Sequence, residues 1–226
     1  MTRVSFYTDP ACPWAWITSR WIVEVAHERD LDISWRSFSP EVRDGGVRMP
    51  AAIPAHLRAL AQARRTVAGV ALPVLEVVRS RYGEAAAGRF YTEFGLRLNE
   101  PDRPHEHPAP GLVGDALRAA ALDAEAESAA AGAVWQSEVA RSTHEAMEAV
   151  GRGATTPVIV LEDDSPVGMS GPILSTVPAG ETALRLWDTF RFLAQNSSFL
   201  EVRRDRPVPT FPRLCDWLGM PARRSC

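Results

Sequence analysis

Apolar positions in the first forty residues follow first a strand pattern and then a helix pattern. Val4 to Tyr7 is a short apolar run without clear alternation, which is typical of a strand buried on both faces. From Trp16 to Asp30 the apolar residues recur at helical spacing, and Ile33 to Phe38 follows as a second strand. This order predicts a βαβ unit, whose crossover should be right-handed.

Between about Pro50 and Gly151 the pattern becomes alanine-rich and helical. Glycine and proline punctuate the block, and Pro101 to Pro110 is its clearest loop. The predicted helical segments are Ala51–Arg65, Pro73–Arg81, Glu84–Leu98, Leu112–Ala121 and Ala133–Val150. We interpret the block as a helical insertion that packs over one end of a sheet.

The last third of the chain returns to strands and then to a helix. Val158 to Leu161 reads as a strand, and Pro166 to Met169 as its hairpin partner. Gly180 to Gln195 is predicted as a final helix. The proline- and arginine-rich residues from Glu201 onward predict a tail that wraps the surface or is partly disordered.

Composition narrows the class of protein. The chain has 226 residues, 46% of them hydrophobic, which is enough for a substantial core. A net charge of −3 does not suggest a nucleic-acid partner. No run is long enough for a signal peptide or a membrane span, so we expect a cytoplasmic protein without a membrane partner. Cys12, Cys215 and Cys226 are too few and too widely spaced for a disulfide scaffold or a zinc site.

Cys12 is the candidate catalytic residue, because it stands between the first strand and the first helix. Unpaired N–H groups and the positive end of the helix dipole point at such a position. They stabilise a thiolate, so the sequence predicts a lowered pKa for Cys12. The alternative is a buried structural cysteine. Asp9 either caps the helix or tunes the thiolate, and we favour capping.

The histidines offer weaker candidates. His105 and His107 flank Glu106 but have no third ligand nearby, so we predict no metal site. His56 and His144 fall in the helical block, where each is either a surface residue or an acid–base group lining a cleft. We include His56 in the candidate substrate pocket.

Two motifs carry a family resemblance: Cys12-Pro13-Trp14-Ala15 at the start of the first helix, and Thr156-Pro157 before a strand. With the order of elements, they resemble the DsbA-like branch of the thioredoxin superfamily, and most closely the mycothiol-dependent nitroreductases of actinobacteria. Kappa-class glutathione transferases and 2-hydroxychromene-2-carboxylate isomerase are more distantly similar. The supporting segments are Asp9-Pro10, residues 16–22, Val150-Gly151, Thr155, residues 171–175, residues 178–181 and residues 186–188.

The resemblance implies an α/β fold, thioredoxin-like with an α-helical insertion. It divides the chain into a thioredoxin-like domain (residues 1–45 and 152–200), an inserted helical domain (46–151) and a C-terminal tail (201–226). It implies that Thr156-Pro157 is a cis-proline bond facing the cysteine. The cofactor-binding residues implied are Pro13, Trp14, Ala15, Thr156 and Pro157. The candidate substrate pocket comprises Trp16, His56, Gly171 and Pro172.

Ala15 departs from the family, which usually has a second cysteine there, so no disulfide can form within this motif. Monothiol exchange between Cys12 and mycothiol, or another low-molecular-weight thiol, remains open. The protein then acts as an oxidoreductase or transferase on a small electrophilic, aromatic molecule. Alternatively the cofactor's own sulfur reacts, as in a thiol-dependent isomerase, or the protein only binds a small molecule. An engineered Cys→Ala change is a further explanation for the alanine at position 15. For the oligomeric state, we expect a monomer or a homodimer.

Overall fold

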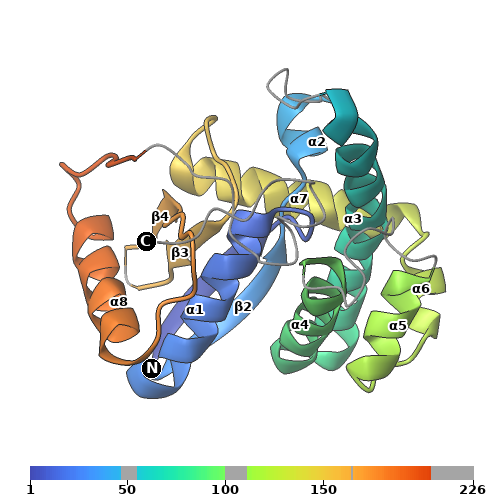
Figure 1. Ribbon diagram of the computed structural model, residues 1–226, viewed down its shortest axis with the longest axis horizontal. Helices are drawn as coiled ribbons and strands as arrows, with labels where there is room; N and C mark the ends of the chain where they lie inside the picture. Colours follow the sequence, from blue (N-terminus) through green and yellow to red (C-terminus); the bar gives the residue numbers. More distant parts are fainter. Residues whose placement is uncertain (47–54, 100–110, 164, 205–226) are drawn as a thin grey trace.

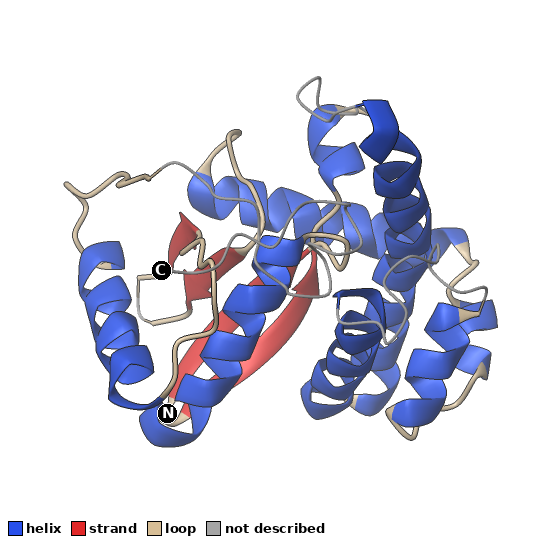
Figure 2. Cartoon of the chain, in the orientation of Figure 1, coloured by secondary structure: helices blue, strands red, loops and turns tan. Residues whose placement is uncertain are grey.

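The computed structural model describes residues 1–46, 55–99, 111–163 and 165–204. Four strands form one mixed sheet in the order β2-β1-β3-β4 (Figure 2). β1 (Thr2–Thr8) pairs in parallel with β2 (Leu31–Ser37), while β3 (Val158–Leu161) pairs antiparallel with both β1 and β4 (Val167–Ser170). The predicted βαβ unit and the C-terminal hairpin are therefore confirmed.

Helices cover both faces of this sheet (Figure 1). α1 (Pro13–Arg29) and α8 (Gly180–Ala194) share one face, and α7 (Ala133–Val150) lies on the other. Neighbouring β1 residues show why, because Phe6 packs into the cluster that contains α1, whereas Tyr7 packs with Ala146 of α7. β1 is consequently buried on both faces, as its lack of clear alternation predicted.

The remaining helices stand beside the sheet, next to the carboxyl end of β1 and the start of α1 (Figure 1). They are α2 (Pro40–Asp44), α3 (Ala55–Tyr82), α4 (Glu84–Asn99), α5 (Leu112–Ala119) and α6 (Glu125–Ala129). α2 and α6 have five residues each and were not predicted, since they are too short to show a helical period. The division of the chain into domains stays a prediction. α7 belongs to the predicted insertion of residues 46–151, yet it packs directly on the sheet.

α3 corrects one prediction, because a single helix replaces the two segments expected on either side of residue 70. The helix continues through Pro73, which cannot donate a backbone hydrogen bond and disfavours a helix interior by about 3 kcal/mol. Leu72, Val74 and Leu75 around this proline are all buried. Their burial against the neighbouring helices offsets the local cost of the proline, which a sequence pattern does not reveal.

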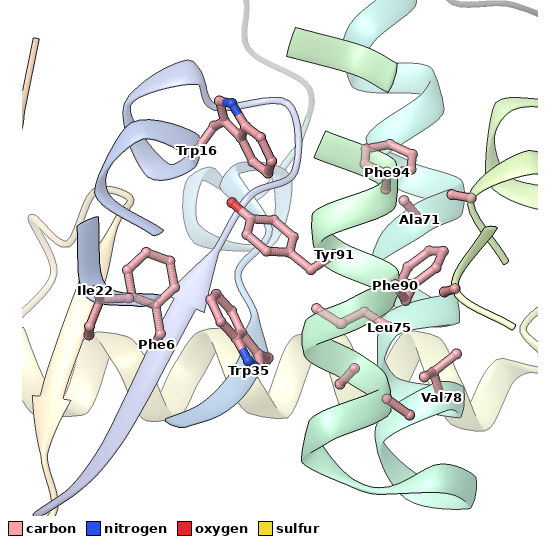
Figure 3. Packing of buried hydrophobic residues seen from close by; sticks show 14 of the residues in the cluster. Phe6, Trp16, Ile22, Trp35, Ala71, Leu75, Val78, Phe90, Tyr91 and Phe94 are labelled. Carbon is pink, nitrogen blue, oxygen red and sulfur yellow. The ribbon is translucent and has the colours of Figure 1, made fainter. Parts of the chain in front are cut away.

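Aromatic side chains join the sheet to α4 (Figure 3). Tyr91 of α4 lies between Trp16 of α1 and Trp35 of β2, with ring centroids 6.0 Å and 5.2 Å away. Phe6 extends the row, 5.3 Å from Trp35. All four rings are buried, so the position of α1 relative to α4 depends on this stack.

We expect Gly95→Ala to lower the free energy of unfolding by about 1–3 kcal/mol, because a methyl group there would overlap the buried indole of Trp16. Gly69→Ala is the matched control, since Gly69 is an exposed glycine of α3 with open space at its Cβ position. This control should stabilise the helix slightly. Urea unfolding of both variants checks the prediction, and equal effects would contradict it.

In the described part of the chain, no helix combines the length and the apolar character needed to cross a lipid bilayer.

Candidate thiol site

Cys12 occupies the N-cap of α1, immediately after the turn that follows β1. Its backbone N–H donates to the carbonyl oxygen of Asp9 at 2.9 Å, and its carbonyl accepts from Trp16 N at 3.1 Å. Pro13 is the first helical residue, where the missing N–H costs nothing. α1 therefore begins three residues before the predicted Trp16, and the half-buried Cys12 is held at its first turn.

The loop before β3 faces Cys12 from a distant part of the sequence. The Thr156-Pro157 bond is cis, as the resemblance implied. The Cys12 thiol donates to the carbonyl oxygen of Thr156, with 3.7 Å between Sγ and O. Thr156 is half-buried and Pro157 is buried. The structure thus places the backbone of Thr156 at the candidate nucleophile.

Gly171 and Pro172 lie next to this loop. The N–H of Gly171 donates to the carbonyl of Pro157 at 2.7 Å, and the Thr18 hydroxyl of α1 donates to the carbonyl of Pro172 at 2.8 Å. Gly171 has a φ of 105°, a region that side-chain-bearing residues rarely adopt. Two of the four residues assigned to the substrate pocket are therefore adjacent to the thiol site, through α1 and the Pro157 loop.

The other residues of the motif differ in exposure. Trp14 is half-buried, whereas Ala15 and Trp16 are buried. The indole of Trp16 is 1% exposed and packs on Tyr91 in the core (Figure 3), so it presents no open face to a substrate. The burial of Trp16 therefore does not support its assignment to the substrate pocket.

Several sequence candidates lie away from the site or outside the described residues. Outside the described residues lie the side chain of His56, the segment His105 to His107, Cys215 and Cys226. His144 is exposed on α7. No group of three or more potential metal-ligating side chains occurs within the described ranges.

Burial raises the pKa of the Cys12 thiol above its usual value, and the charge of Asp9 raises it further. A hydrogen bond from the Thr156 side chain and the backbone N–H groups of Ala15 and Trp14 oppose both effects. The sequence-based expectation of a lowered pKa for Cys12 was therefore wrong. The helix start does supply N–H donors, but desolvation of the sulfur and a nearby carboxylate outweigh them.

Asp9 forms a turn and does not cap the helix. Its Oδ1 accepts from the N–H of Ala11 at 2.9 Å, while Cys12 itself is the N-cap and no side chain caps the helix. Asp9 is only 9% exposed, and burial raises its pKa to about 6. The Ala11 N–H and the charges of Arg64 and Arg65 lower that pKa in part.

Sequence reasoning missed Arg64, which is 7% exposed in α3. Its Nη2 donates to the carbonyl of Ala11 at 3.2 Å, inside the turn before Cys12. The sequence did contain a pattern that could have indicated its burial. Arg64 precedes Ala68, Ala71 and Leu75 at helical spacing, and these residues form the buried face of the helix. Only the fold shows that this face meets the cysteine turn.

An open pocket of about 930 Å³ lies at the other end of the sheet, near the start of β1. Its lining includes Arg3, Glu162 and Val167, and none of its residues belongs to the thiol site.

The fold and the site define the class of protein. A thioredoxin-like sheet with a helical insertion, and a cysteine at the first helix facing a cis-proline loop, is the arrangement of DsbA-like proteins. Among solved structures, the chain is similar to a probable DsbA oxidoreductase, SCO1869, from Streptomyces coelicolor, at a TM-score of 0.56 and 19% identity, covering 92% of this chain and 94% of that one. It is also similar to the cytosolic disulfide reductase DsbM from Pseudomonas aeruginosa, at a TM-score of 0.57 and 12% identity, covering 85% and 100%.

A 2-hydroxychromene-2-carboxylate isomerase has the same fold, with a TM-score of 0.50 and 17% identity over 87% of this chain and 98% of that one. The sequence resolves the family more finely. The family model described as Rv2466c-like, mycothiol-dependent nitroreductase Rv2466c, matches residues 11–204, and the chain belongs to this family. The uncharacterized protein Rv2286c of Mycobacterium tuberculosis is 28% identical over 212 residues, covering 91% of this chain and 83% of that protein. The chain thus belongs to a family described as thiol-dependent reductases, while its likeness to the isomerase shows the fold alone.

Proposed function

We propose that the protein is a mycothiol-dependent oxidoreductase or transferase that acts on a small electrophilic, aromatic molecule through Cys12 alone. The observation that carries this proposal is the placement of the Cys12 sulfur, half-buried at the first turn of α1 and 3.7 Å from the backbone carbonyl of Thr156. Membership in a family described as mycothiol-dependent supports the choice of thiol.

The residues around Cys12 fit a bound thiol with amide groups. The Thr156 backbone faces the sulfur and offers a peptide carbonyl, and Trp14, two residues after Cys12, is half-buried. A thiol-linked ligand that carries an amide would thus meet both a hydrogen-bonding backbone and an aromatic surface. Pro157 and Ala15 are buried, and the backbone N–H of Ala15 hydrogen-bonds the sulfur.

In the proposed exchange, the Cys12 thiolate attacks one sulfur of oxidised mycothiol. A bond forms between Cys12 and that sulfur, the original disulfide bond breaks, and the second mycothiol leaves as a thiolate. In the reducing direction, Cys12 and one mycothiol give two electrons and two protons to the electrophilic acceptor and become joined as a mixed disulfide. A second mycothiol thiolate then attacks the mycothiol sulfur, the bond to Cys12 breaks, and Cys12 leaves as a thiolate. Two mycothiols thereby give two electrons and two protons to the acceptor and end as one disulfide. Cys12 is the sole cysteine of the described residues, and in this scheme a thiol from solution resolves its mixed disulfide.

We expect incubation with oxidised mycothiol to add one mycothiol to the protein, and Cys12→Ser to abolish the addition completely. Serine keeps the size of the side chain but is far less nucleophilic than a thiolate. Intact-mass analysis measures the adduct, and peptide mapping assigns it to Cys12. Cys215→Ser with Cys226→Ser is the matched control and should keep the adduct. An adduct that survives in Cys12→Ser would refute a monothiol site at Cys12.

An isomerase is the second candidate, favoured by Ala15 and by the raised pKa of the Cys12 thiol. In this reaction a thiol cofactor adds through its own sulfur to a conjugated double bond, and it is expelled after rotation. No net electron transfer occurs, so neither a resolving cysteine nor a Cys12 thiolate is needed. Counting thiols during turnover separates the two, because a reductase consumes two thiols per cycle and an isomerase consumes none.

A further inference from the structure

Arg64 is a buried cation that connects three elements at the thiol site. Its Nη1 donates to the carbonyl of Leu98 at 2.9 Å, near the carboxyl end of α4, and its Nη2 donates to Oδ1 of Asn99 at 2.6 Å. The same Nη2 contacts the carbonyl of Ala11 at 3.2 Å, one residue before Cys12. A planar guanidinium can meet three acceptors in this way, whereas a lysine ammonium lacks the fork.

Two acidic groups lie in the electrostatic range of this cation. The Asp9 carboxyl and the Cys12 thiol each favour the charged form of Arg64, while burial lowers the pKa of Arg64 to about 10. Arg64 therefore stays protonated near neutral pH. Because electrostatic interactions are reciprocal, its charge favours both the Asp9 carboxylate and the Cys12 thiolate.

Other charged groups also face Asp9 and Cys12. Glu41 and Arg43 of α2 and Arg65 of α3 act on or respond to Asp9, and Tyr91 of α4 interacts with the Cys12 charge. Arg43 and Arg65 are both half-buried, and Arg43 is paired with Asp44. The pKa of Tyr91 is about 12, so its phenol is neutral near neutral pH. Arg64 is the most deeply buried cation of this set.

We propose that Arg64 is the positioning residue of Cys12: it holds the turn from Asp9 to Ala11 against α4 and supplies the positive charge that allows the thiolate to form. The inference rests on the proposed function, since it assumes that Cys12 is the reacting group. It assigns to the helical insertion a direct part in activating the sulfur, beyond covering it.

Asp9 competes with Cys12 for this positive charge. The pKa of Asp9 is about 6 in the folded protein and about 3.9 in an unfolded chain. Because the folded state binds the Asp9 proton more tightly, stability should fall as the pH rises from about 4 to 6. Above that range Asp9 is charged and opposes the thiolate, and Arg64 is the buried cation that interacts with both groups.

The test is the pH dependence of Cys12 alkylation by iodoacetamide, followed by mass spectrometry on the peptide that carries Cys12 in the full chain. We expect Arg64→Met to raise the midpoint of this profile and to slow alkylation at neutral pH about tenfold, which corresponds to one pKa unit. Arg64→Lys keeps the charge but loses the fork. It should lower the melting temperature while the midpoint stays near that of the wild type.

Arg97→Met is the matched control, because Arg97 is a half-exposed arginine of α4 paired with Glu93. It should leave the midpoint unchanged. If Arg64 had only a structural role, Arg64→Met and Arg64→Lys would lower the melting temperature with equal midpoints. That result would overturn the proposal.

Arg64→Met leaves Asp9 buried without its cation and can fail to fold for that reason. The double variant Asp9→Asn with Arg64→Met removes both charges and is then compared with Asp9→Asn alone. A higher midpoint in the double variant supports the proposal, and equal midpoints overturn it. Since iodoacetamide needs no mycothiol, this result is independent of whether oxidised mycothiol forms an adduct.

Discussion

We expect Ala15→Cys to replace the mycothiol adduct with an internal disulfide. Position 15 follows Cys12 by three residues in the first turn of α1, and the Ala15 N–H hydrogen-bonds the Cys12 sulfur. A thiol at position 15 would lie next to any mixed disulfide on Cys12 and would resolve it within the molecule. After incubation with oxidised mycothiol, intact-mass analysis should show a protein lighter by two hydrogen atoms and without an attached thiol.

Ala15→Ser is the matched control, because it adds an atom of similar size at the same buried position without a second sulfur. It should keep the single adduct of the wild type. Should Ala15→Cys retain the adduct as fully as Ala15→Ser, the geometry of the first turn would not allow a dithiol reaction. The monothiol character would then be a property of the whole site and not of residue 15.

The second large effect concerns stability. We expect Trp21→Ala to lower the free energy of unfolding by about 3–5 kcal/mol. Trp21 is fully buried between α1 and α8, with its ring 6.0 Å from Trp187 and 6.3 Å from Phe190. Its Nε1 also donates to the carbonyl of Ala183 at 3.0 Å, so truncation removes a hydrogen bond and leaves a cavity.

Urea unfolding monitored by circular dichroism measures this loss. Phe192→Ala is the matched control, since Phe192 is an aromatic residue of α8 that is 68% exposed. Its removal should change the free energy of unfolding by less than about 0.5 kcal/mol. Similar losses in the two variants would mean that α8 does not depend on the Trp21 contact.

Local pattern predicted most of the elements around the sheet. The bounds of β3 and α7 agree with the predicted segments, and β1, β2, α4 and α8 differ by a few residues at their ends. These elements have clear periods, bounded by glycine, proline or charged residues. α3 was mispredicted because Pro73 is a strong local signal for a break, yet the burial of its neighbours depends on helices distant in the sequence.

The candidate site shows the same division. Cys12 and the Thr156-Pro157 loop were identified from motifs and order, although 144 residues separate Cys12 from Thr156. The direction of the Cys12 pKa was mispredicted, because the number of N–H groups at a helix start follows from sequence, whereas desolvation does not. Asp9 was expected to cap the helix, and its actual partner, the Ala11 N–H, belongs to a turn whose geometry the fold sets.

The sequence by itself determined the βαβ unit, the place of the candidate nucleophile at the first helix, the absence of a second cysteine at position 15 and the family. These follow from residue identity and short-range spacing, which act within a few turns of chain. Only the tertiary structure decided which charges surround Cys12. Arg64 reaches the Ala11 carbonyl from a helix about fifty residues away, and burial then strengthens its effect on Asp9 and Cys12, because the surrounding core screens charge far less than water does.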